Sequence, residues 1–83
     1  MPKIPTPPRP LYHIASEIMK DWGDKVNYAA RPYLEAMAQL GTVDQNFGYD
    51  SGRSVVRYFL SNAGSWRGET ARRIKAELKE MVK

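Results

Sequence analysis

The chain contains no cysteine and only one histidine among its 83 residues. Without cysteine there is no disulfide framework and no thiolate nucleophile or metal ligand. The single histidine, His13, leaves little material for general acid–base catalysis, and no His/Cys spacing suits zinc. No glycine-rich loop precedes a Lys-Ser or Lys-Thr pair that could hold phosphates. We therefore expect a non-enzymatic protein with no catalytic residues, no metal, no cofactor and no small-molecule substrate.

Long apolar runs are also missing. None approaches the ~18 residues that a helix needs to cross a bilayer. The first ten residues, MPKIPTPPRP, lack the continuous apolar segment of a signal peptide. These absences predict a soluble, cytoplasmic protein with no membrane partner. The length predicts one domain, near the size at which a single core is just adequate.

Proline is rare except at the start, where it supplies five of the first ten residues. Proline fixes φ and lacks an amide donor, so this segment is predicted to be neither helix nor central strand. We predict a flexible, extended, proline-rich arm over residues 1–9 and a single helical domain over residues 10–83. Whether the arm is ordered as a strap across the domain stays open.

Apolar residues recur with helical spacing in four segments and alternate with polar residues nowhere. The first predicted helix runs from Pro10 to Trp22, with Met19 on its apolar face. The second runs from Tyr28 to Leu40, with Ala29 in its core face. Its regular part either begins near Arg31 or is kinked at Pro32. The predicted fold class is all-α, a small four-helix bundle, and the polar segment 42–50 is expected to be a packed loop or short helical turn.

The last two helices are predicted to be joined by a tight turn over residues 62–65. Asp50 or Ser51 caps the third helix, Gly64 provides a left-handed stop, and Ser65 caps the fourth helix. This outline resembles a helix-turn-helix, although the apolar anchors of its second helix come one residue late. Its basic residues lie along the middle and end of the last helix, which favours phosphate contact over base reading.

Positive charge is concentrated in the C-terminal part of the chain. Residues 1–50 have a net charge of −1 and residues 51–83 a net charge of +5. Arg73 is predicted to pair with Glu69 and Glu77 at i, i+4 spacing. Beside that neutralised side, four unpaired cations fall within a sector of roughly 80°; they are Arg72, Lys75, Lys79 and Lys83.

A candidate macromolecule-binding surface combines these cations with basic and aromatic residues of the third helix and the turn. Arg53 and Arg57 are predicted to face solvent, and Tyr58 and Trp66 are the best candidates for exposed aromatic residues beside arginine. The alternative is an ordinary solvated surface of mixed charge. The full candidate set is Arg53, Arg57, Tyr58, Trp66, Arg67, Arg72, Lys75, Lys79 and Lys83.

The segment Ser-Trp-Arg-Gly-Glu at residues 65–69, followed by Ala-Arg-Arg-Ile-Lys at 71–75, is the most distinctive part of the chain. With the stretches at 9–22, 28–37 and 49–78, it resembles a group of small helical proteins encoded by tailed bacteriophages and prophages. The resemblance covers residues 9–82. It implies a phage-encoded protein acting in the host bacterial cytoplasm, and it carries over no activity and no binding residues.

Two functions are compatible with these features. The first is a helical binding module that acts on a host or phage protein partner, with host takeover or anti-defence as special cases. The second is a nucleic-acid-binding accessory protein that uses the basic surface of the last two helices. The identity of the partner and the oligomeric state do not follow from the residues.

Overall fold

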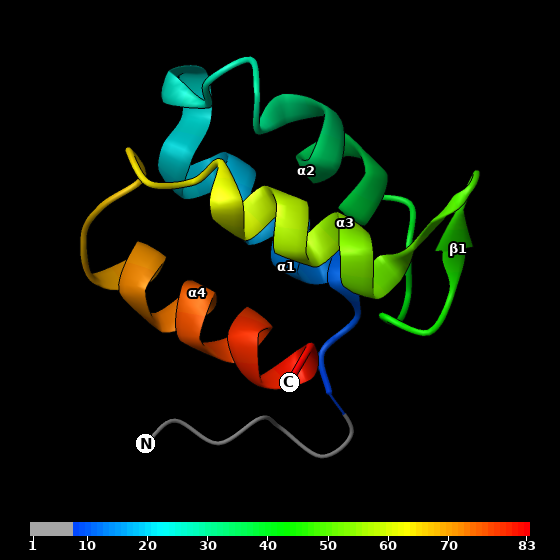
Figure 1. Cartoon of the computed structure of the whole chain (residues 1–83). Coiled ribbons are helices and arrows are strands. Elements are labelled where there is room, and N and C mark those ends of the chain that lie inside the picture. Colours follow the sequence, from blue (N-terminus) through cyan, green and yellow to red (C-terminus); the bar gives the residue numbers. More distant parts are fainter. Residues whose placement is uncertain (1–7) are drawn as a thin grey trace.

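The computed structural model describes residues 8–83 (Figure 1). The predicted arm therefore lies outside the described residues, apart from Pro8 and Arg9. The described chain is mostly helical, as predicted, with four α-helices and one small two-stranded sheet. The elements are α1 (Leu11–Trp22), η1 (Gly23–Lys25), α2 (Arg31–Met37), β1 (Asn46–Phe47), β2 (Asp50–Ser51), α3 (Gly52–Ser61) and α4 (Glu69–Met81).

Helix α1 forms because its apolar residues fall on one side of the helix. Pro10 is the N-cap, with extended backbone, so the helix begins one residue later than predicted. Met19 was predicted in the apolar face but is 40 % exposed. It lies roughly 80° from the centre of that face, beyond the residues that α2 and α4 cover. Gly23, with φ of 60°, ends the helix as predicted.

Helix α2 begins at Arg31, the first of the two predicted alternatives, with Pro32 in its first turn. The preceding turn is held by Asn27, whose side-chain oxygen accepts a hydrogen bond from the Ala30 amide at 2.8 Å. The helix ends at Met37, earlier than predicted. Ala29, predicted in the core, is exposed because it lies in this turn and not on the helix.

The expectation that the chain has no strands is wrong for residues 46–51. β1 and β2 pair antiparallel, with Phe47 opposite Asp50, across the two-residue turn Gly48–Tyr49. Gly48 has a φ of 64° and Tyr49 does not have positive φ. This combination is that of a type II′ hairpin turn, which places glycine first. The hairpin projects from the N-terminal end of α3 (Figure 1).

The connection between α3 and α4 is longer than the predicted tight turn, because it spans residues 62–68. Gly64 does not have positive φ, and Ser65 does not cap α4. The left-handed position is Gly68, with φ of 113°, which is also the N-cap of α4. The extra length carries Trp66 into the core, where it is 2 % exposed. The predicted cap at the start of α3 is confirmed, since Ser51 accepts the Ser54 amide at 3.1 Å.

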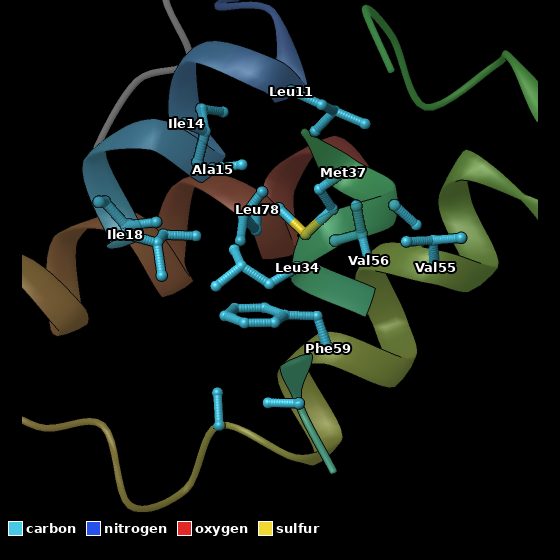
Figure 2. Packing of buried hydrophobic residues seen from close by; sticks show 14 of the residues in the cluster. Leu11, Ile14, Ala15, Ile18, Leu34, Met37, Val55, Val56, Phe59 and Leu78 are labelled. Atoms are coloured by element: carbon cyan, nitrogen blue, oxygen red, sulfur yellow. The ribbon is translucent and has the colours of Figure 1, made fainter. Parts of the chain in front are cut away.

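The hydrophobic core receives side chains from all four α-helices. Figure 2 shows these side chains converging, with Phe59 pointing from α3 into the shared interior. The predicted burial of Ile18, Phe59 and Ile74 is confirmed, because none of the three is accessible to solvent. Glu77 is the one charged residue buried with them among residues 8–83. It accepts hydrogen bonds from Arg9 at 2.6 and 2.9 Å.

Candidate functional site

Two of the predicted surface arginines bind backbone carbonyls at the C-terminal end of α4. Arg53 donates to the Met81 carbonyl at 3.1 Å and to Asp44 Oδ1 at 3.2 Å. Arg57 donates to the Val82 carbonyl at 2.8 Å. The last carbonyls of a helix have no partner within the helix and carry its negative dipole end, so cations stabilise them there. Both arginines are therefore engaged within the protein, which was not predicted.

The two aromatic residues that were predicted to be exposed lie in different environments. Trp66, predicted to be exposed, is a core residue: it stacks on Trp22 with ring centroids 5.6 Å apart. Its indole N–H donates to Asp21 Oδ2 at 2.8 Å. Tyr58 is half-exposed and packs against Tyr33, with ring centroids 5.3 Å apart. The sequence did not indicate that Trp66 is buried, because Trp66 has polar neighbours and lies in a connection. No helical spacing assigns a residue of a connection to a buried face.

The predicted charge pairing along α4 is wrong. Arg73 binds Glu17 of α1 and not the glutamates of its own helix. Glu17 also accepts from Arg9 at 2.8 Å. These hydrogen bonds, first that from Arg9 and then that from Arg73, lower the pKa of Glu17 despite its partial burial. Arg73 thus belongs to a cluster of ion pairs that joins α1 to α4, although its side chain is still half-exposed.

Lys83, which was predicted to be unpaired, forms an ion pair with Glu80 at 2.9 Å. Once Arg53, Arg57 and Lys83 are set aside, four cationic candidates remain, and none of them has a carboxylate within ion-pair distance among residues 8–83. We call them the basic quartet: Arg67, Arg72, Lys75 and Lys79. Arg67 comes from the connection and the other three come from α4. The structure therefore reduces the nine predicted residues to one smaller group that extends from the connection before α4 to the last turn of that helix.

Lys75 is the most constrained member of the basic quartet. Its Nζ donates to the Trp66 carbonyl at 2.6 Å and lies 5.8 Å from the centroid of the Trp66 ring. Partial burial lowers the pKa of Lys75, and the neighbouring charges of Lys79 and Arg67 lower it further. The positive charges of Lys79 and Arg67 are therefore close enough to Lys75 to repel it.

A hollow of about 340 Å³ opens beside these cations. No acidic residue lines it, and Glu69 at the start of α4 is exposed outside it. Gly64 and Gly68 leave open space, since a Cβ at either position would meet nothing within 4 Å. The hollow is lined by Arg67, Arg72 and Lys75, by Trp66, and by Gly64, Gly68 and Ala71.

Two other kinds of site, a metal centre and a membrane-spanning helix, have no residues to form them in the described part of the chain. Within residues 8–83, no three His, Cys, Asp or Glu side chains are grouped to hold a metal ion. Over the same range, no helix has the length and apolar character needed to cross a bilayer. No family model, curated protein or solved structure matches the chain. The basic quartet and its hollow are therefore the features on which a function is argued.

Proposed function

We propose that this chain is a phage-encoded, non-enzymatic binding module that docks on an acidic surface of a host or phage protein in the bacterial cytoplasm. Its scaffold is a small four-helix bundle, and its docking surface is the basic quartet. The sequence resemblance over residues 9–82 supports the phage origin. The observation that carries the proposal is the grouping of four cations over residues 67–79, none of which has a carboxylate partner among residues 8–83.

The grouping of these four cations over residues 67–79 supports a binding role, because single cations without a carboxylate partner, such as Lys20 and Lys25, also occur elsewhere in the described chain. Arg9 and Arg73 are paired with carboxylates, and Arg53 and Arg57 bind carbonyls at the end of α4. An ordinary exposed ion pair contributes only tenths of a kcal/mol to the stability of a protein. Leaving four neighbouring cations unpaired therefore costs the fold little stability. A partner with acidic residues would relieve their mutual repulsion and would be attracted by their field.

Nucleic acid is the second candidate partner, because the quartet would also suit backbone phosphates. The connection over residues 62–68 is longer than the three- or four-residue turn of a helix-turn-helix. Trp66 of this connection is also buried in the core and is not exposed at the surface. Any nucleic-acid binding would therefore use phosphate contacts and would not depend on base sequence.

A pull-down from bacterial lysate, with and without nuclease, tests both candidates. We expect one host protein to be recovered after nuclease treatment and to be released by salt, which screens charge–charge contacts. Arg72→Glu should abolish the recovery. Lys20→Glu is the matched control, because Lys20 is an exposed lysine of α1 that has no carboxylate partner in the described chain and does not line the hollow. Recovery that nuclease abolishes would favour the second candidate, and equal recovery with Arg72→Glu would contradict the proposed surface.

A further inference from the structure

We propose that the hollow beside the basic quartet is a phosphate-monoester site, which recognises a phosphorylated side chain on the protein partner. This inference rests on the proposed function, because it names the chemical group that the quartet meets. It follows from how Arg67, Arg72 and Lys75 are arranged, from the hydrogen-bond donors they leave available, and from the charge that they concentrate in one hollow.

The three cations approach the hollow from two segments. Arg67 precedes Gly68, whose φ of 113° turns the chain into α4. Arg72 and Lys75 follow on the first two turns of that helix, one turn apart, and both line the hollow with Arg67. The left-handed backbone at Gly68 therefore places a cation from before the helix beside two cations from within it.

The cations keep most of their hydrogen-bond donors. An ammonium group has three donors, and Lys75 uses one of them on the Trp66 carbonyl at 2.6 Å. Neither Arg67 nor Arg72 is bonded to another side chain or carbonyl in the part of the chain that the structure describes. Each guanidinium presents a fork of donors that matches an oxyanion in two-point geometry. An anion in the hollow would therefore have donors available from three different side chains.

The amount of charge favours a phosphate monoester over a carboxylate. A phosphorylated side chain carries about −1.5 to −2 charge at pH 7 and three acceptor oxygens. A carboxylate carries one charge on two oxygens, and a nucleic-acid phosphodiester also carries one charge. Because Arg67 and Lys79 already repel Lys75, the ligand with the greater negative charge relieves more repulsion.

The frame of the hollow is fixed by the core. The residue before Arg67 is Trp66, whose ring is stacked on Trp22 and donates a hydrogen bond to Asp21. The Trp66 carbonyl, held by this anchor, in turn positions the Lys75 ammonium. Because the Lys75 ammonium is already held in position, the site loses less conformational entropy when a ligand binds. Clusters of arginines recognise phosphorylated residues in other proteins.

Four fluorescein-labelled probes test the inference at pH 7.5 and ~50 mM salt by fluorescence anisotropy. Three of the probes are peptides with the same Gly/Ala/Ser-rich sequence except at the central residue, which is phosphoserine, aspartate or serine. The fourth probe is a 20-base-pair DNA duplex. We expect the phosphoserine peptide to bind about tenfold or more tightly than the aspartate peptide. Arg72→Ala should weaken that binding about tenfold, and the Lys20→Ala control should leave it within about twofold. In ¹⁵N spectra, the phosphopeptide should shift the amides of residues 67–75 and the Trp66 indole.

Three results would overturn the inference. Equal binding of the phosphoserine and aspartate peptides would show an unspecific acidic docking surface, which still agrees with the proposed function. Duplex DNA binding more tightly than the phosphopeptide, with the same loss on Arg72→Ala, would identify a nucleic-acid surface instead. Failure of every probe to bind would remove the phosphate site, whereas the lysate experiment separately decides whether an acidic protein partner exists.

Discussion

Replacing Phe59 with alanine removes the largest fully buried side chain of the core. The ring has no solvent exposure and packs edge-on against both tryptophans, with centroid distances of 6.2 Å to Trp22 and 6.4 Å to Trp66. A Phe→Ala change in such a site costs ~3–5 kcal/mol, from lost burial and the cavity left behind. The whole domain is expected to be stable by about 4–12 kcal/mol, at 0.05–0.15 kcal/mol per residue. The variant should therefore lose a large part of its stability.

Urea denaturation followed by circular dichroism at 222 nm measures the effect. We expect Phe59→Ala to have a midpoint far below that of the unchanged protein or to be largely unfolded without urea. Tyr58→Ala is the matched control, since Tyr58 is the preceding residue of the same helix but is 47 % exposed; it should cost clearly less than Phe59→Ala, about 1–2 kcal/mol, because only half of the side chain and its contact with Tyr33 are lost. A cooperative Phe59→Ala transition within ~1 kcal/mol of the unchanged protein would refute the central position of α3 in the core.

Three further predictions concern backbone and charge. Gly68→Ala should lower stability by about 1–3 kcal/mol, measured by thermal melting, because its φ of 113° strains any residue with a Cβ; Gly64→Ala, without positive φ and with open space around it, should melt within a few degrees of the unchanged protein. Gly52→Ala should destabilise the hairpin and the start of α3, because the added Cβ would lie 2.8 Å from a backbone Cα; unchanged protection of the 45–53 amides in hydrogen exchange would contradict this. The pKa of Glu17 is lowered in the folded state, so its stabilising effect should be complete above the ordinary value of 4.5 and be lost as pH falls below it; Glu17→Gln should show a flatter fall in urea midpoint from pH 5 to pH 3.

The regular parts of the fold could be predicted from the sequence because helical spacing is a local property. The stripes of α1, α3 and α4 have that spacing, and Ser51 is a local capping signal. The hairpin also had a local signal, since the glycine of Gly48–Tyr49 is the first residue of a two-residue turn. That signal was missed because the flanking strands are only two residues long.

The candidate site could be predicted only in part, because the partners of charged residues are set by the tertiary fold. Arg9 binds Glu77, 68 positions away, and Arg73 binds Glu17, 56 positions away. No i, i+4 rule identifies such pairs. Spacing correctly placed Arg72, Lys75 and Lys79 on one side of α4, but it could not show which neighbouring cations were already neutralised.

The stacking of Trp22 on Trp66 gives the protein a localised optical signal. These are the only two tryptophans of the chain, and their ring planes are inclined by 16°. Near-ultraviolet absorption and emission from tryptophan therefore report on one place, where the end of α1 meets the connection over residues 62–68. Since the same Trp66 lines the basic hollow, movement of this segment would change the coupling between the two indoles. The unlabelled protein thus contains its own spectroscopic reporter for events at that surface.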